Sequence, residues 1–268
     1  MSDFEKLMVV VKYEFLKHIR RARLYIILGI ALLAEALVLI LVPTLMTGGF
    51  PDNVKVMAAL LTVGPSMAAL GAVFFAGDAI AGEYEGKTGF LLFTNPVKRV
   101  ILWSGKYLAG FIAITLLMIF TYIIIAISLL VIYQEVPVEI FKSFGLALFY
   151  AAATLSTTFF FSSISRGSMG ATIMTLVFVW VICGILESVL ALTGNPYWYI
   201  LTAGGDSIAL VYGGMEQTMG GFGGLGGGGN LMDAFKTPTL GMAAWGMAIY
   251  FVGGFVASIF LAGRRQLS

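Results

Sequence analysis

Residues 102–132 read LWSGKYLAGFIAITLLMIFTYIIIAISLLVI, and this run decides the class of the fold. Lys106 is its one charged residue. A helix rises 1.5 Å per residue, so about 20 apolar residues cross the ~30 Å hydrocarbon core of a bilayer. The run therefore predicts a transmembrane helix, and it is long enough to tilt or to project from the membrane.

The composition of the whole chain agrees with this prediction. Of the 268 residues, 59% are hydrophobic and 11% are charged, and the mean hydropathy is +0.97. Soluble domains carry about 25% charged residues, because a surface that faces water needs them. The chain has too few polar residues to cover a soluble core, so we expect an integral membrane protein.

Five further apolar segments are long enough to span a bilayer. Their continuous runs favour helices over the short alternating segments of a closed β-barrel. Gly64-Pro65 interrupts the second segment and should bend it. We predict an all-α membrane protein, one transmembrane domain over residues 1–268, with spans at 24–43, 56–76, 102–132, 144–162, 169–192 and 240–262.

Lysine and arginine set the expected orientation. Six spans place both termini on one side, and thirteen of the sixteen basic residues fall on that side, leaving Lys55, Lys142 and Lys236 on the other. Basic residues collect on the cytoplasmic side of membrane proteins. The sequence therefore predicts a multi-pass protein of the cell membrane with both termini cytoplasmic.

Two segments outside the spans have distinct patterns. Residues 3–22 place apolar side chains at three- and four-residue steps, with basic residues and His18 off that stripe, which predicts an amphipathic interfacial helix that contacts lipid headgroups. A solvated basic leader is the alternative. Residues 193–239 form the predicted extracytoplasmic loop, with a short helix against the membrane near its start and a glycine-rich run at 213–229.

The stretch AGEYEGKT, residues 81–88, ends like a phosphate-binding P-loop. A P-loop needs a preceding β-strand and a turn of backbone N–H groups facing the phosphates. Here an apolar span precedes the stretch, and Glu83 and Glu85 would place two negative charges at the triphosphate. We therefore predict no ATP binding by this chain.

Catalytic and metal sites are also not expected. Cys183 is the single cysteine and His18 the single histidine, which argues against zinc clusters and against Ser-His or Cys-His catalysis. We predict no catalytic residue, no cofactor or metal site in the chain, and no nucleic-acid partner.

Glu35 lies about 11 residues into the first span, roughly 16 Å deep by helical rise. A carboxyl group at that depth is costly to bury and indicates a function by default. We therefore name Glu35 as a possible residue of a translocation pathway. A protonated or hydrogen-bonded structural residue is the open alternative.

The inner segment, residues 77–101, is by its residues alone either a helix-turn that docks on another protein or an ordinary amphipathic loop. It resembles the signature region of ABC-2 type transporter permeases, the membrane subunits of one class of ATP-binding-cassette exporters. The resemblance rests on Ile80-Ala81, Glu83, Glu85, Thr88, Leu91-Leu92, Pro96-Val97, Arg99 and Gly105-Lys106-Tyr107-Leu108. Lys87 and the glycine-rich outer loop depart from the family pattern.

This resemblance implies a division of labour. A separate ATPase subunit, which holds ATP and magnesium, would dock on a cytoplasmic coupling helix between spans two and three. A second permease copy, identical or related, would complete the exporter, and the pair would alternate between inward- and outward-facing states. The implied coupling residues are Asp78, Glu83, Glu85, Thr88, Leu91, Leu92, Pro96 and Arg99.

Two refinements complete the expectations. Glu83 and Glu85 are two residues apart, so on a helix they face about 200° from each other. One of them should therefore pair within the permease, with Lys87 or Arg99. The alternative function is a self-contained secondary transporter or channel that uses Glu35 as its intramembrane carboxylate, although the chain shows no internal repeat.

Overall fold

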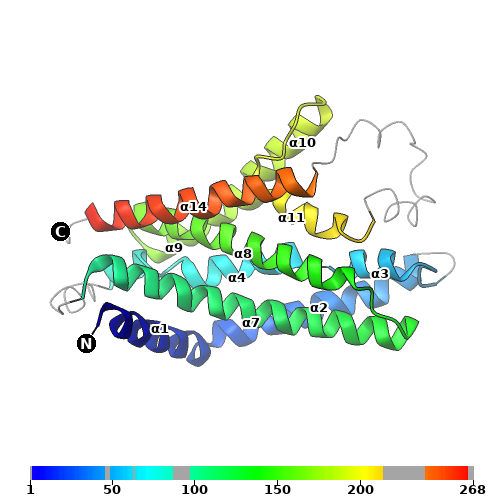
Figure 1. The fold of residues 1–268 in the computed structure, drawn as a ribbon, viewed down its shortest axis with the longest axis horizontal. Helices are drawn as coiled ribbons and strands as arrows, with labels where there is room; N and C mark the ends of the chain where they lie inside the picture. Colours follow the sequence, from blue (N-terminus) through cyan, green and yellow to red (C-terminus); the bar gives the residue numbers. More distant parts are fainter. Residues whose placement is uncertain (1, 46–48, 63, 87–96, 214–238, 265–268) are drawn as a thin grey trace.

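The computed structural model describes residues 2–45, 49–62, 64–86, 97–213 and 239–264, and every regular element in these ranges is helical (Figure 1). Six helical segments are long and apolar enough to cross a membrane. They run over Ala22–Leu45, Val54–Glu85, Arg99–Tyr133, Glu139–Ile164, Ser168–Leu192 and Leu240–Arg264. The predicted six-span, all-α fold is confirmed.

Four of these spans are single helices. They are α2 (Ala22–Leu45), α7 (Arg99–Tyr133), α8 (Glu139–Ile164) and α14 (Leu240–Arg264). The 35 residues of α7 measure about 52 Å, well beyond a ~30 Å hydrocarbon core. The helix therefore projects from the membrane or tilts within it, as its sequence predicted.

The second span is built from three helices, α3 (Val54–Leu61), α4 (Gly64–Ala76) and α5 (Ala81–Glu85). The first break falls directly before Gly64-Pro65, where the sequence predicted a bend. Pro65 stands in the first turn of α4, where a missing backbone N–H removes no helical hydrogen bond.

The fifth span changes its helical form halfway. It begins as α9 (Ser168–Leu176), widens into the π-helix η1 (Val177–Cys183) and continues as α10 (Gly184–Leu192). π-Helical turns are rare and frequently occur at functional sites. Nothing in the sequence pattern predicted this change.

Helix α8 lies at the centre of the bundle, in contact with α4, α7, α9, α11 and α14. Its middle reads AAATLSTT over residues 151–158, and all eight of these residues are buried. Small side chains let neighbouring helices approach closely, which is how helices associate where lipid surrounds them.

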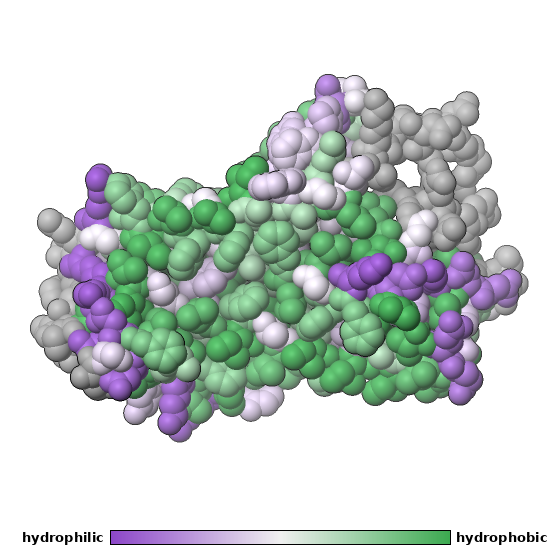
Figure 2. Space-filling model, in the orientation of Figure 1, coloured by the Kyte–Doolittle hydropathy of each residue, from purple (hydrophilic) through white to green (hydrophobic). Residues whose placement is uncertain are grey.

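The outer surface of the bundle is apolar. Large hydrophobic side chains are exposed along α2, α7, η1 and α14, among them Leu33, Ile123, Val181 and Phe260. Figure 2 shows a broad hydrophobic band between hydrophilic residues that gather towards the two ends. Such a band matches the requirement of a bilayer for apolar contact around the whole protein.

Both termini lie at the same end of the bundle (Figure 1). There Lys98 Nζ lies 2.6 Å from a carboxylate oxygen of Asp3, and Arg99 donates to the carbonyl oxygen of Gly263 at 3.0 Å. We call this the terminal end. Its assignment to the cytoplasm stays a prediction.

The first helix, α1, covers Asp3–Arg20, close to the predicted 3–22. Ser2 and Glu5 form a capping box at its start. It packs along the beginning of α7, and its buried residues are Val11 and His18. The placement of His18 on the polar face was wrong, because its ring packs edge-on against Phe75 with centroids 5.3 Å apart. The interfacial position of α1 stays a prediction.

The predicted short helix near the start of residues 193–239 is present as α11 (Leu201–Leu210). It packs against α14, α8, α4 and η1. Nearly all of the glycine-rich run lies outside the described residues.

Candidate functional site

A four-residue turn, Gly77–Ile80, separates α4 from α5 at the terminal end. Ser162 of α8 holds this turn with three hydrogen bonds. Its hydroxyl oxygen accepts from the backbone N–H of Ile80 at 3.1 Å and of Ala81 at 3.0 Å, and it donates to the carbonyl of Gly77 at 2.9 Å. One buried side chain thus satisfies backbone groups that the interrupted helix leaves open.

Glu83 of α5 points into the protein and is buried. Its carboxylate accepts a hydrogen bond of 2.6 Å from Lys106 Nζ of α7. The same ammonium group donates to Glu14 of α1 at 2.8 Å, and the Lys106 side chain is 1% exposed. A buried ammonium group requires such partners, because leaving it unpaired costs several kcal/mol.

Lys17 of α1 completes the cluster. Its Nζ lies 3.3 Å from Glu14 and 3.8 Å from Glu83, so each carboxylate reaches both ammonium groups. Burial acts to raise the pKa of Glu14, but the charges and hydrogen bonds of Lys106 and Lys17 outweigh it and hold that pKa below its usual value. We call Glu14, Lys17, Glu83 and Lys106 the ion cluster; its two negative charges balance its two positive ones.

Asp78, in the turn before α5, binds the junction between α1 and α2. It accepts a hydrogen bond of 2.5 Å from Arg21 and one of 3.0 Å from Arg23. The first span is therefore tied at its start to the end of the second.

Glu85 binds a third element. Its carboxylate accepts from the backbone N–H of Ser168 at 2.8 Å and from the Ser168 hydroxyl at 2.6 Å. Ser168 begins α9, whose N-cap residue Gly167 has no side chain to offer. Glu85 thus supplies the missing cap and places a negative charge at the positive end of the helix dipole.

The structure brings together only part of the predicted coupling set. Glu83 and Glu85 belong to α5, and Asp78 lies in the turn before it. Arg99 begins α7 beside the end of α14. Glu83 pairs with Lys106, a partner that we did not expect. Outside the described residues lie Lys87, Thr88, Leu91, Leu92 and Pro96.

Four residues of this site were missed by sequence reasoning: Glu14, Lys17, Lys106 and Ser162. Lys106 carried a signal, because it is the single charge of the run 102–132 and belongs to the motif Gly105–Leu108. A charge inside an apolar span needs a partner. The sequence did not show which partner.

Glu35 of α2 lies away from this site, about ten residues from the opposite end of its helix. It is 1% exposed, and neither carboxyl oxygen has a hydrogen-bond partner among the described residues. The α5 site and Glu35 are therefore separate features.

The charged side chains around α5 are all engaged in contacts within the part of the chain that the structure describes. Each carboxylate there is engaged by a basic group or a helix terminus, and no three His, Cys, Asp or Glu side chains gather as a metal site would need in the described ranges. What the arrangement can do is mechanical: it fixes α5 to α1, α7 and α9.

Six apolar spans, an apolar outer band and a segment at the terminal end that is fastened by ion pairs define a multi-pass membrane protein. Residues 10–182 match the model of the ABC-2 family transporter proteins. The match covers more than half of the chain and includes the ion cluster, Asp78 and the Glu85 cap. The chain belongs to this family and is a transport permease. A comparison with curated proteins gave no match.

Proposed function

We propose that this permease is the membrane subunit of an ATP-binding-cassette exporter. A separate ATPase subunit, which holds ATP and magnesium, docks on the segment 77–101 at the cytoplasmic side. Two permease copies form the exporter, and ATP-driven closure of the ATPases moves them between inward- and outward-facing states. The chain itself carries out no hydrolysis.

One observation carries this proposal: the acidic residues of the segment bind the permease itself. Asp78 reaches the junction of α1 and α2, Glu83 reaches α1 and α7, and Glu85 reaches α9. When α5 moves, these contacts either hold it back or pull the attached helices with it. Such contacts meet the requirement that a driving partner bias two arrangements of a stiff element.

The ion cluster supports movement as well as attachment. Glu83 lies 2.6 Å from Lys106 and 3.8 Å from Lys17, so a shift of α5 along α1 exchanges one ammonium partner for the other. Neither carboxylate loses all of its charge neutralisation during such a shift. The desolvation penalty of an unpaired buried charge is thereby avoided.

The residues divide into two roles under this proposal. Asp78, Glu83, Glu85 and Arg99 hold the segment on the permease. The ATPase contacts come from the part of the segment that includes Thr88, Leu91, Leu92 and Pro96, as the family resemblance implies.

The matched variants Glu83→Gln and Glu85→Gln test the proposal. Glu83→Gln leaves the buried ammonium group of Lys106 with one carboxylate in place of two, at a cost of about 3–5 kcal/mol, whereas Glu85→Gln weakens an exposed helix cap. We expect Glu83→Gln to reach the membrane but to lose the ATPase or substrate-stimulated ATP hydrolysis, and Glu85→Gln to retain most of both.

The readouts are membrane abundance, co-purification of an ATPase subunit in mild detergent, and hydrolysis by the purified complex. A parent permease that never retains an ATPase contradicts the exporter assignment. Two variants that both behave like the parent contradict the coupling role of α5 alone.

We also propose that Glu35 lines the translocation pathway. Its two buried oxygens without a partner support this role, because a carboxyl group at this depth is costly unless a function retains it. Glu35→Gln should lower transport while ATPase binding is unchanged. Transport that is driven by an ion gradient without any ATPase would favour the alternative, a secondary transporter with Glu35 as its carboxylate.

A further inference from the structure

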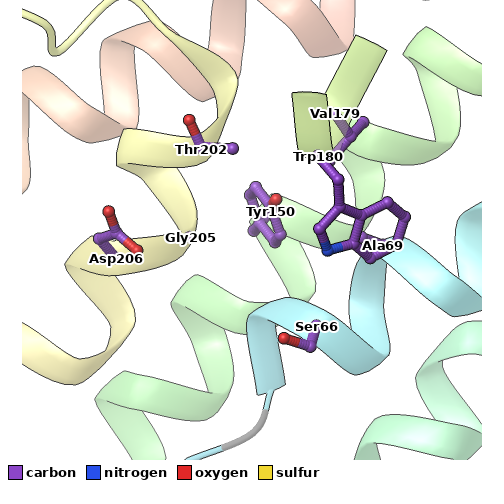
Figure 3. Close-up of a pocket in the computed structure, with 8 residues that line it drawn as sticks. All are labelled: Ser66, Ala69, Tyr150, Val179, Trp180, Thr202, Gly205 and Asp206. Atoms are coloured by element: carbon purple, nitrogen blue, oxygen red, sulfur yellow. The ribbon is translucent and has the colours of Figure 1, made fainter. Parts of the chain in front are cut away.

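A cavity of about 160 Å³ lies between α4, α8, η1 and α11, away from the α5 site (Figure 3). It is at mid-depth in the bundle. Tyr150 is the twelfth of the 26 residues of α8, and Trp180 is the thirteenth of the 25 residues of the fifth span. The π-helix η1 supplies Val179 and Trp180 to its wall, so the irregular turn and the cavity coincide.

The hydroxyl group of Thr202 at this cavity is buried and has no hydrogen-bond partner among the described residues. Tyr150 is 3% exposed, and its phenol faces the cavity between Thr202 and Asp206 of α11 and Trp180 of η1 (Figure 3). Buried polar groups are nearly always hydrogen-bonded, so the Thr202 hydroxyl indicates a polar occupant.

The ionisable groups at the cavity are acidic. Asp206 lines it, and the carboxyl group of Glu187 in α10 lies nearby. None of the eight lining residues is basic.

The walls add two aromatic rings, Tyr150 and Trp180. Rings of this kind attract a cation over their faces. A carboxylate and hydroxyl oxygens accept hydrogen bonds, so the occupant should donate them. Two carboxyl groups fall short of the ligand set that a metal ion takes, and the described residues hold no group of three.

The volume restricts the size of the occupant. Water occupies about 30 Å³ per molecule in the liquid, so the cavity holds about five waters, whereas sites for drug-sized molecules start near ~300 Å³. Trp180 is 42% exposed on the outer face of the fifth span, so a ligand can approach from the side of the bundle.

We propose that this cavity is a binding site for a small primary ammonium group. Asp206 takes the charge, Tyr150 and Thr202 accept N–H hydrogen bonds, and Trp180 covers the cation with its ring. The ammonium group comes either from a soluble amine or from the headgroup of an aminophospholipid. This site does not depend on the ATPase, and ligand binding to it can be measured on the permease alone.

The test uses the purified full chain labelled with 5-fluorotryptophan, which gives four ¹⁹F resonances for its four tryptophans. Trp180→Phe identifies the Trp180 signal. Propylammonium chloride should shift this signal with saturation, whereas propanol, of the same shape without charge, and sodium chloride should not. A Trp180 signal that does not move, or that moves equally with propanol, overturns the proposal.

Variants locate the binding to named groups. Asp206→Asn should weaken propylammonium binding about tenfold or more, the loss expected for a hydrogen bond to a charged group. The matched control Asp52→Asn removes an exposed carboxylate elsewhere and should leave the affinity unchanged. Equal effects of the two variants, or none from Asp206→Asn, contradict the assignment.

Tyr150→Phe removes only the hydroxyl group. It should weaken propylammonium more than tetramethylammonium, because the latter has no N–H group to donate. The three other tryptophan signals report whether each variant is folded; if Asp206→Asn disturbs them, Glu187→Gln, which leaves Asp206 in place, takes over the test of the carboxyl pair. A carboxyl variant that is folded and binds like the parent overturns the proposal.

Bilayer nanodiscs distinguish the two sources. If phosphatidylethanolamine, compared with phosphatidylcholine, shifts the Trp180 signal and competes with propylammonium, the ammonium group is that of a lipid. If only propylammonium shifts the signal, the ligand is a soluble amine. Both results support the ammonium site.

Discussion

Lys106 shows how a single residue connects sequence, packing and function. Its side chain is 1% exposed and lies between two carboxylates that come from α1 and α5. Removing either carboxylate leaves less compensation for a buried charge, which is why Glu83 and Glu85 are expected to differ although both are acidic.

The buried side chain of His18 makes the docking of α1 depend on pH. Burial, which outweighs the nearby carboxylates, lowers its pKa from 6.5 to about 4. Between about pH 6.5 and pH 4 the undocked helix α1 binds more protons than the docked one, so docking weakens as the pH falls through this range. The full loss is about 3 kcal/mol.

We expect the thermal stability of the purified permease to fall between about pH 7 and pH 5, before carboxylates of lowered pKa titrate. His18→Gln, which stays neutral, should be less stable at pH 7 and much less sensitive to pH. A parent and variant with parallel pH profiles would show that His18 does not report on docking.

The contacts between individual side chains were also the hardest feature to predict from the sequence. Asp78, Glu83 and Glu85 were singled out from a motif, but their partners were not. Arg21 lies 57 positions from Asp78 in the chain, and Ser168 lies 83 positions from Glu85. Pairing over such separations depends on how the helices pack, and no local pattern encodes that geometry. Ser162 gave no signal because a serine in a small-residue helix is ordinary.

At the scale of elements, the contact of α1 with α7 depends on a close approach at Gly105. A Cβ atom placed there would lie 2.6 Å from Cγ1 and 2.9 Å from Cβ of Val10. Such distances require the backbone of one helix to move.

Gly105→Ala should therefore displace α1 and destabilise the permease by about 1–3 kcal/mol, the usual cost of overpacking. The matched control is Gly29→Ala in α2, where a Cβ atom meets nothing within 4 Å, and it should be neutral or slightly stabilising. The measurements are melting temperature and the rate of tryptic cleavage within α1. Equal results for the two variants would mean that α1 is not held at Gly105.

Element positions followed from sequence where a physical rule fixed them. Apolar length placed the six spans, and Pro65 placed the bend between α3 and α4. The π-helix η1 was not predicted, because its residues, VFVWVIC, suit an ordinary α-helix equally well. Two of its residues, Val179 and Trp180, line the cavity.

At the scale of the whole molecule, the placement of both termini at one end leaves the side of the membrane to be tested. Cysteines introduced at Gly226 and at Gly86 should differ: the first should react with an impermeant thiol reagent on intact cells, and the second should not. Native Cys183 is 1% exposed and should give little background. The reverse labelling would overturn the orientation drawn from lysine and arginine.

Hydropathy predicted the six-span architecture because the bilayer requires each span to be apolar along its own length. The order of packing around α8 is a different matter, since it depends on which small-residue faces meet. The run of residues 151–158 indicates a buried helix after the fact, but several spans of this chain contain small residues.

The hydroxyl of Ser162 has a consequence for amide hydrogen exchange. Ile80 and Ala81 lie at the edge of a turn, where amides usually exchange with solvent quickly, yet both donate to this buried oxygen. These two amides should exchange as slowly as those inside α8 for as long as α5 stays in place. Their exchange rate therefore reports how often α5 detaches, and it can be measured without any transported substrate.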